Sequence, residues 1–392
     1  MTKENVWLYG GFAMSSSKRP VKVIHMAPLG AGGISKLTVT IQRLLDPQKV
    51  RFDYLVFRDR KEFLEDQAIA LGGRKQIIDT ENLHNDAIKF IKKFKGMVCL
   101  FRKEKYDVVH VDASTPYDVM VALAAKVAGI KTIVLHSHND DFQKSKPLRD
   151  AFMPLYKVIM LFVVTDYFTI SEKAAQFMFP KLIFRKKKYQ LVRNGIDTEE
   201  FLFSEEDRKK ARIELGVEDK VVVGHIGRFV YQKNHEFILK TFAEYHKMNP
   251  NSVLLLVGEG ELLDSTKKLA KALGVFDNVI FYGVTHEVRK VLLAMDVFIF
   301  PSRFEGLGIV AIEAQANGLL TLCADSIVEE VNVTDRFVRV HGWDCKHWAE
   351  EMIKHLEKER HSDCRQQVIE SGYDIKTTVR QLEDFYVRSA LK

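Results

Sequence analysis

The feature that most constrains this chain is an alternation of short apolar runs with helical stretches, and the alternation occurs twice. The first series opens with an apolar run at 21–27, passes through the glycine cluster at 30–33 and continues with helical spacing over 34–45. A strand, a glycine loop and a helix in this order are typical of a doubly wound α/β domain. Such alternation predicts a parallel sheet with helices on both faces. Further strands are predicted at 52–57, 108–111, 132–135, 167–170 and 190–192.

The pattern restarts after the turn at 194–197, where we place the boundary between two domains. A length of 392 residues suits two α/β domains of just under 200 residues each. We therefore predict a first domain over 1–195, a second over 196–374 and a terminal helix over 375–392. The second domain has predicted strands at 221–226, 252–257, 279–282, 297–300 and 319–322, with helices at 234–246 and 261–273.

Charge is divided unequally between these two parts of the chain. Residues 1–195 hold 33 Lys and Arg against 19 Asp and Glu, while the remainder holds 26 against 33. The balance is therefore +14 in the first part and −7 in the second, which favours an anionic partner for the first domain alone. The basic and apolar segments 89–105 and 177–188 suggest an anionic membrane surface. Nucleic acid is not expected, because the basic residues are dispersed and no binding motif is present.

The remaining composition argues for a cytoplasmic protein. Four cysteines occur without a CxxC pair, as is usual for reduced thiols. The most apolar stretch, 152–168, contains Lys157 and Asp166 and is shorter than the ~18 uninterrupted apolar residues of a membrane span. Residues 1–20 lack the pattern of a signal peptide, and Met14 is an alternative start. A peripheral position on the inner face of the cell membrane is a further expectation.

Two basic residues follow the strand predicted at 221–226. Arg228 and Lys233 are five residues apart, just beyond the carboxyl end where ligands of α/β domains bind. A nucleoside diphosphate needs such cations, because its phosphates gain charge as the bond to the sugar breaks. The alternative for this pair is an ordinary solvated surface. We predict that both side chains bind a diphosphate.

Two carboxylates flank a glycine-rich turn after the strand predicted at 297–300. Glu305 lies in the turn, and Glu313 lies eight residues later, about two helical turns inside the following helix. One carboxylate can accept hydrogen bonds from sugar hydroxyls and the other from a ribose diol. The backbone amides of Gly306, Leu307 and Gly308 can approach an anion at the helix N-terminus, which makes this loop a candidate donor-binding segment. The alternative is a pair of structural acids on a helix.

Two histidines end the strand predicted at 132–135. His136 and His138 point to the same side at strand spacing, so one imidazole could enter a cleft between the two predicted domains and donate a hydrogen bond to a sugar. Two alternatives remain open: a strand-end histidine bound by the backbone, or a metal site. The metal site would belong to a metal-dependent hydrolase that uses His110, Asp112, His136, His138 and Asp140.

The glycine cluster at 30–33 resembles a dinucleotide fingerprint but departs from it. Ser35 stands where the third glycine of that fingerprint belongs. Gly32 and Gly33 can still bring backbone amides to the phosphates from the other side of the cleft. We count both glycines as candidate donor-binding residues.

In these motifs, and in their order along residues 21–390, the chain resembles the family-4 glycosyltransferases, which have the GT-B fold. The resemblance implies two Rossmann-like domains facing a cleft, with a terminal helix crossing back to the first. It implies a retaining transfer from an activated sugar, commonly a UDP-sugar. It also implies that Arg228 and Lys233 hold the diphosphate, Glu305 the donor sugar and Glu313 the ribose. His138 best matches the cleft histidine of the family, with His136 a close competitor.

The segment 323–334 departs from the commoner family pattern and looks like the branch that builds bacterial capsule and exopolysaccharide. A glycan or a lipid-linked acceptor is expected. No cofactor and no metal ion is expected, since two cations and backbone amides can neutralise the leaving group. We favour attack from the front face of the sugar, with the departing diphosphate taking the proton of the acceptor hydroxyl. A sugar-nucleotide epimerase of the same fold is the closest alternative enzyme.

Overall fold

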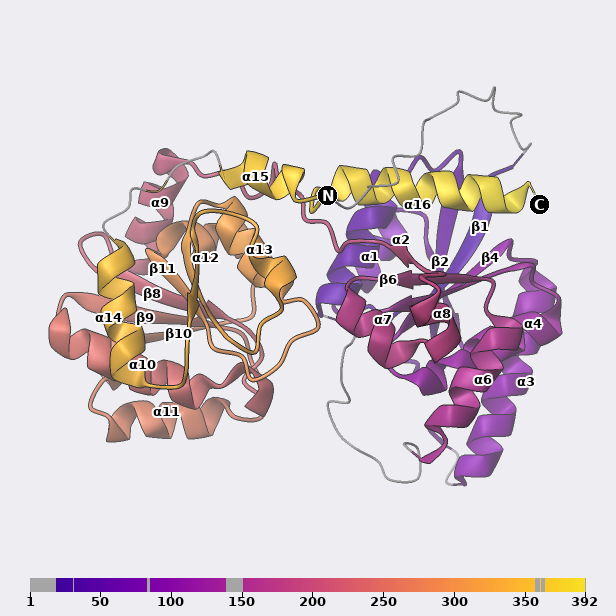
Figure 1. The fold of residues 1–392 in the computed structure, drawn as a ribbon, viewed down its shortest axis with the longest axis horizontal. Coiled ribbons are helices and arrows are strands. Elements are labelled where there is room, and N and C mark those ends of the chain that lie inside the picture. The colour runs from indigo at the N-terminus through magenta and orange to yellow at the C-terminus, as the bar shows by residue number, and fades with distance from the viewer. Residues whose placement is uncertain are drawn as a thin grey trace.

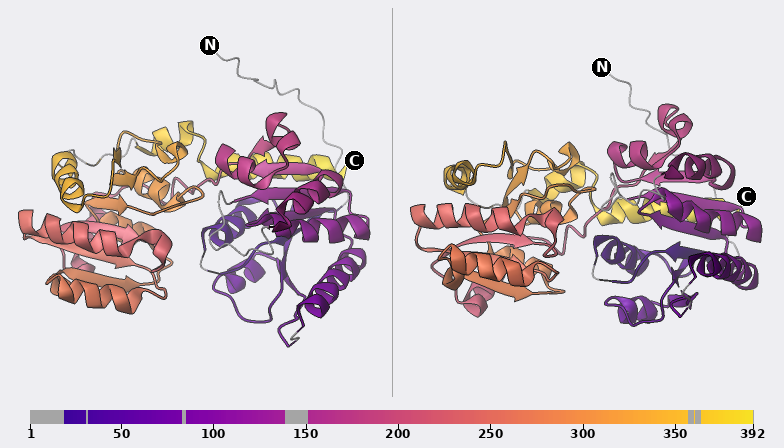
Figure 2. Two further views of the ribbon diagram at one scale, coloured as in Figure 1. Left: turned by 60° about the horizontal axis from the view of Figure 1, so that its bottom comes forward. Right: turned by 90° about the horizontal axis from the view of Figure 1, so that it is seen from below.

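The computed structural model describes residues 19–30, 32–82, 85–138, 151–356, 360 and 364–391. Two parallel sheets stand side by side, each with helices on both faces (Figures 1 and 2). This arrangement confirms the predicted pair of doubly wound domains. Within the described ranges, no helix combines the length and the apolar character needed to cross a bilayer.

The first sheet has seven parallel strands in the order β3-β2-β1-β4-β5-β6-β7. The order reverses between β1 and β4, and ligands of doubly wound domains bind at such a switch point. The strands are β1 (Val21–Met26), β2 (Val50–Val56), β3 (Arg74–Ile77), β4 (Val108–Ala113), β5 (Thr132–Ser137), β6 (Asp166–Thr169) and β7 (Gln190–Leu191).

Two apolar clusters hold helices against the faces of this sheet. One contains buried side chains from α1 (Gly33–Leu44) and α2 (Glu65–Ala70). The other contains side chains from five helices on the opposite face. These are α3 (Asp86–Glu104), α4 (Val119–Ala128), α6 (Met153–Val163), α7 (Glu172–Met178) and α8 (Lys181–Arg185).

The second sheet repeats the topology with six parallel strands in the order β10-β9-β8-β11-β12-β13. Its switch point lies between β8 and β11. The strands are β8 (Val221–Ile226), β9 (Ser252–Val257), β10 (Val279–Gly283), β11 (Val297–Phe300), β12 (Leu320–Ala324) and β13 (Phe337–Val340). The helices are α9 (Glu205–Leu215), α10 (His235–Met248), α11 (Leu263–Ala272), α12 (Val288–Ala294), α13 (Ile309–Ala316), α14 (Cys345–Leu356) and α15 (Cys364–Glu370).

The terminal helix α16 (Ile375–Ala390) crosses back onto the first domain, as expected (Figure 1). Its start is fixed by a parallel bridge between Ile196 and Asp374. The helix then contributes buried side chains to the apolar cluster that contains α1 and α2, namely Val379, Leu382 and Tyr386. The two crossings of the chain between the domains therefore lie next to each other.

Candidate active site

The loops that follow β8 and β11 meet at the switch point of the second sheet. Gln232 Nε2 donates to the carbonyl of Phe304 at 2.9 Å, and the amide of Arg303 donates to the carbonyl of Gln232 at 2.8 Å. These bonds join the two segments in which the sequence places the diphosphate site and the first carboxylate. The predicted residues are therefore brought together by backbone contacts as well as by topology.

The β8 loop positions the two predicted cations differently. Lys233 is half-buried, and its Nζ lies 2.6 Å from Glu305 Oε1 and 4.9 Å from the centre of the Phe300 ring. Arg228 is exposed, and among the described residues its guanidinium has no hydrogen-bond or ion-pair partner. A Cβ at Gly227 would lie 2.8 Å from His225 Nε2, so a larger residue there would displace a neighbouring side chain. Arg228 is thus free to bind an anion, while Lys233 already faces a carboxylate.

The loop after β11 contains the buried Glu305. It ends at Gly308, where another residue would be strained. The Glu305 residue is 7% exposed and Leu307 is 3% exposed, while Gly306 is half-buried. Gly308 has a φ of 85°, and a Cβ there would lie 2.7 Å from the Phe300 ring. It is the N-cap of α13 and offers no side chain to the first amides of the helix. The N-terminus of α13 is consequently a place where backbone amides can meet an anion.

The second carboxylate reaches the first domain. Glu313 is 7% exposed, and its Oε1 lies 3.2 Å from Nζ of Lys36 on α1. Desolvation lowers the pKa of Lys36, but the carboxylates of Glu313 and Glu200 more than offset this, so that the pKa is raised. Because α13 begins at Ile309, Glu313 lies little more than one turn inside the helix, not two as the sequence suggested.

The glycine loop of the first domain abuts the same helix terminus. Gly32 is the N-cap of α1 and makes no side-chain capping bond. A Cβ at Gly33 would lie 3.9 Å from Ile309 Cδ1, so the first turn of α1 faces the first turn of α13. Two helix N-termini, one from each domain and each with a partial positive charge, therefore lie close to each other. This geometry suits the two negative charges of a diphosphate.

The predicted histidines lie inside a buried polar cluster of the first domain. His138 Nε2 is 3.0 Å from Asp112 Oδ1, and His136 Nδ1 is 3.2 Å from His110 Nε2. Both histidines are 4% exposed. Burial, with smaller contributions from neighbouring histidines, holds the pKa of His136 well below its usual range. His25 and Tyr386 complete the cluster through bonds of 2.9 Å to Asp112 and 2.8 Å to His110.

This cluster bears on the expected hydrogen bond to the sugar. If His138 donates its Nε2–H to Asp112, its Nδ1 carries a lone pair and can only accept a hydrogen bond from a hydroxyl. His138 Nδ1 and His136 Nε2 are buried and lack a partner among the described residues. The structure therefore leaves both histidines as candidates. A cavity of about 10 Å³ lies beside them.

The alternative metal site can be assessed from the same residues. His25, His110 and Asp112 form one group with ligand atoms close enough for an ion, and Asp112, His136 and His138 form another. Asp140, the fifth predicted ligand, lies outside the described residues. Both groups belong to the first domain and share no residue with the site around Arg228.

The structure also adds residues that sequence reasoning missed. Gly258 has a φ of 138°, and a Cβ there would lie 2.2 Å from the carbonyl oxygen of Gly227, so the β9 loop presses on the β8 loop. A Gly-x-Gly after a predicted strand was the available signal. Lys36 and the stack of Phe63 on His286, with ring centres 3.9 Å apart, join the domains and have no local sequence signal.

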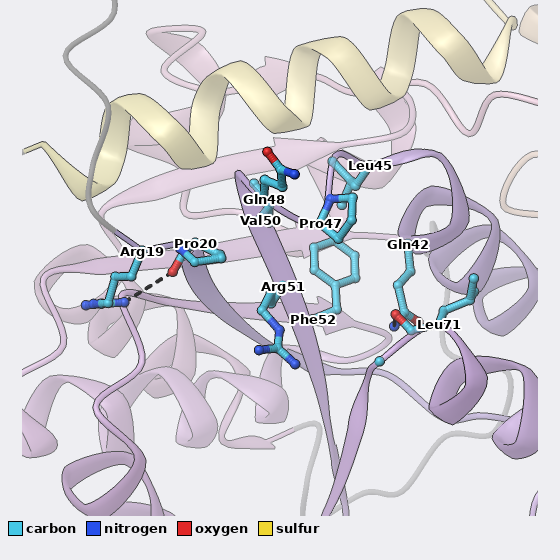
Figure 3. A pocket seen from close by; sticks show the side chains of 11 residues that line it. Arg19, Pro20, Gln42, Leu45, Pro47, Gln48, Val50, Arg51, Phe52 and Leu71 are labelled. Atoms are coloured by element: carbon cyan, nitrogen blue, oxygen red, sulfur yellow. Dashed lines mark hydrogen bonds between the residues drawn. The ribbon is translucent and has the colours of Figure 1, made fainter.

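A cavity of about 410 Å³ lies elsewhere (Figure 3). Pro20 and Val50 line it at the amino ends of β1 and β2, beside Arg51. This is the opposite end of the sheet from the glycine loop. We assign the site from the converging loops, because the cavity contains none of the predicted residues.

Two models of known protein families match the two halves of the chain. The family model "Glycosyltransferase Family 4" matches residues 31–200, and the model "Glycosyl transferases group 1" matches residues 206–374. The chain is 29% identical over 323 residues to the putative glycosyltransferase EpsF of Bacillus subtilis, which covers 81% of this chain and 82% of EpsF. It is 22% identical to the capsular polysaccharide biosynthesis glycosyltransferase CapH of Staphylococcus aureus, over 95% of this chain and 100% of CapH.

Two further similar proteins are a curated relative and a solved structure. An Escherichia coli UDP-Gal:alpha-D-GlcNAc-diphosphoundecaprenol alpha-1,3-galactosyltransferase is 26% identical over 76% of this chain and 81% of its own length. The crystal structure of Anabaena HepE in complex with UDP and glucose superposes with a TM-score of 0.76. It covers 94% of this chain and 99% of HepE, at 16% identity, which shows a shared fold.

Proposed function

This chain belongs to glycosyltransferase family 4, a family of retaining hexosyltransferases, and on that premise we propose that it transfers a sugar from a UDP-sugar to a glycan or lipid-linked acceptor. We propose capsule or exopolysaccharide synthesis in the cytoplasm as its setting. The name of CapH, a capsular polysaccharide biosynthesis glycosyltransferase, supports polysaccharide synthesis. The acceptor class is supported by the diphosphoundecaprenol in the name of the E. coli relative. UDP as the nucleotide is supported by that same name and by the ligand of HepE.

One observation carries the placement of the donor between the domains. The contact of Lys36 with Glu313 brings α1 close to α13 at the switch point of the second sheet. Arg228 follows β8 at the same switch point, and its guanidinium has no partner among the residues that the structure describes. In our proposal the diphosphate binds between these two helix ends, with Arg228 and Lys233 as its side-chain partners. Preorganised positive charge of this kind stabilises the charge that develops on a leaving phosphate. The donor site therefore needs no metal ion in this proposal.

The two carboxylates take different parts of the donor. Glu313 would accept hydrogen bonds from the ribose diol, which requires it to share or release Lys36. Glu305 would bind hydroxyls of the sugar, and its negative charge would favour the positive charge that grows at the anomeric carbon. As the diphosphate draws Lys233 toward itself, Glu305 would become more available to the sugar. Lys233 already contacts Glu305, so this exchange would break one ion pair.

Retention follows in this proposal from attack on the same face that the diphosphate leaves. The acceptor hydroxyl would form its bond to the anomeric carbon as the bond to the diphosphate oxygen breaks. The leaving oxygen would take the hydroxyl proton. Position and electrostatics then supply most of the catalysis. His138 would fix the sugar by accepting a hydrogen bond from one of its hydroxyls, with Asp112 holding the imidazole.

A transfer assay tests this function. Purified protein would be incubated with each of several UDP-sugars, with and without a bacterial lipid extract, while UDP release and the anomer of the product are measured. We expect acceptor-dependent release of UDP and an α-linked product from an α-linked donor. UDP release that is independent of acceptor and yields an epimerised free sugar would indicate the epimerase. An inverted product would contradict the proposed retention.

A further inference from the structure

Helix α6 carries an apolar face that the described residues leave uncovered. Met160 and Val163 are buried in the core of the first domain, as expected for the inner face of a surface helix. The outer face is also apolar, with exposed fractions of 51% for Leu155, 49% for Val158 and 75% for Phe162. Lys157 is the one charged residue of α6, and it is partly buried with its Nζ on the carbonyl of Phe177. A helix that is apolar all round normally has a partner on both sides.

A partner that covers the outer face of α6 must also be compatible with the positive charge next to this helix. The bond from Lys157 to Phe177 ties α6 to the end of α7, which leads directly into α8. Over residues 152–188 there are seven Lys and Arg against two Asp and Glu. Five of these cations are exposed in and after α8: Lys181, Arg185, Lys186, Lys187 and Lys188. Lys181 is near enough to add to the effect of burial in lowering the pKa of Lys157.

Both segments that the sequence associates with a membrane lie on this side of the sheet. Residues 89–105 fall on α3, and residues 177–188 contain α8, and both helices contribute to the same core cluster as α6. Helix α4 contacts both α3 and α6, so these three helices lie next to one another in the first domain (Figure 1). At the N-terminal end of α3, Ile88 and Ile91 are 53% and 51% exposed. Apolar side chains flanked by basic ones are thus a property of the whole helical layer.

From these observations we propose that the first domain docks on an anionic phospholipid surface through the outer face of α6, with the basic residues of α8 beside it. Leu155, Val158 and Phe162 enter the boundary between headgroups and acyl chains, and the lysines meet the lipid phosphates. With 11 residues α6 is too short to span a bilayer, so it lies along the surface. The purpose of the docking, access to a lipid-linked acceptor, rests on the proposed function, whereas the docking itself does not.

Flotation with lipid vesicles tests the docking without any transfer reaction. The full chain would be mixed with neutral phosphatidylcholine vesicles or with vesicles that also contain phosphatidylglycerol, at low and high salt. We expect binding to the anionic vesicles that weakens as salt rises. A double variant, Leu155→Ser with Phe162→Ser, should bind at least about tenfold more weakly. Lys186→Glu and Lys187→Glu should each weaken binding to the anionic vesicles about fivefold or more.

The matched control is Ile213→Ser, which removes an apolar side chain that is 62% exposed on α9 of the second domain. This variant should bind vesicles as the unchanged protein does, and all variants should keep their Tm because the altered side chains are exposed. Equal binding to neutral and anionic vesicles, or undiminished binding by the Leu155→Ser, Phe162→Ser variant, would overturn the proposal. So would a dimer that dissociates when Phe162 is changed, since the face would then belong to a second copy. UDP affinity is measured in parallel, so that failure of the proposed function is seen separately.

Discussion

Changing either glutamate of the proposed donor site to glutamine removes one negative charge, and the surroundings of the two residues predict different consequences. Glu313 pairs with Lys36, whose side chain is 39% exposed, while Glu305 pairs with Lys233, whose side chain is 15% exposed. Glutamine has almost the same shape and keeps a hydrogen-bond acceptor. The two variants therefore test charge rather than packing.

Glu313→Gln should act mainly on binding. A hydrogen bond to a charged group contributes about 1.5–3 kcal/mol, so loss of the ribose contact should weaken UDP roughly 10- to 150-fold. The donor KM should rise by a similar factor while kcat changes little, because the ribose contact persists through the reaction. The Tm should hardly change, since Lys36 can be solvated when its partner loses its charge.

Glu305→Gln should act on turnover and on stability. It leaves the Lys233 ammonium largely buried against a neutral amide, and loss of one partner of a buried pair typically costs 3–5 kcal/mol. Because glutamine still accepts a hydrogen bond, we expect about 2 kcal/mol, or a Tm lower by roughly 4–8 °C. UDP affinity should change little, and kcat should fall, since the lost charge matters most as positive charge grows on the sugar.

Calorimetry with UDP, initial-rate kinetics and thermal unfolding on both variants separate these effects. The assignment of the two glutamates is reversed if Glu305→Gln loses UDP affinity while Glu313→Gln retains it. If neither variant changes binding or rate, the two carboxylates do not contact the donor, and the assignment of the site fails.

Three further outcomes follow from the same structure. Transfer should survive EDTA, and a loss of activity that only Mg²⁺ or Mn²⁺ restores would contradict the proposed neutralisation by Arg228 and Lys233. Gly258→Ala should lower both Tm and UDP affinity, because its Cβ would meet a backbone carbonyl at 2.2 Å. The control is Gly274→Ala, at a position with a φ of 72° and open space, which should lower the free energy of unfolding by only about 1 kcal/mol. Burial, as the main cause, lowers the pKa of His110 to about 3, so the folded protein keeps this imidazole neutral while the unfolded chain binds a proton below about 6.5. Tm measured by calorimetry should therefore fall from pH ~7 to ~5, and an unchanged or rising Tm would refute this account.

The sequence was most informative where strands are buried on both faces. The largely apolar runs 221–226 and 252–257 coincide with β8 and β9, because a central parallel strand is buried on both faces. The edge strands β3 and β13 were missed. Three of the four residues of β3 are polar, and β13 has only four residues, all but one of them half-buried, so neither shows a strand pattern.

The motifs indicated candidate site residues but not all of the residues that contact them in the structure. Arg228, Lys233, Glu305 and Glu313 were predicted because each comes after a strand of the second sheet, and their contacts with a donor stay a prediction. The partner of Glu313, Lys36, is 277 residues away in the sequence, and such a contact depends on how the domains meet. The choice between His136 and His138 also depends on tertiary structure, since the buried cluster engages both.

The measurement that tests the central claim most directly is calorimetric titration of UDP into the unchanged protein and into two arginine variants. Arg228→Ala removes the cation proposed to bind the diphosphate, and Arg51→Ala removes an exposed arginine that lines the distant cavity. We predict a single UDP site, weakened about tenfold or more by Arg228→Ala and unaffected by Arg51→Ala. Absence of UDP binding, or equal affinity in the Arg228→Ala variant, would contradict the proposed donor site.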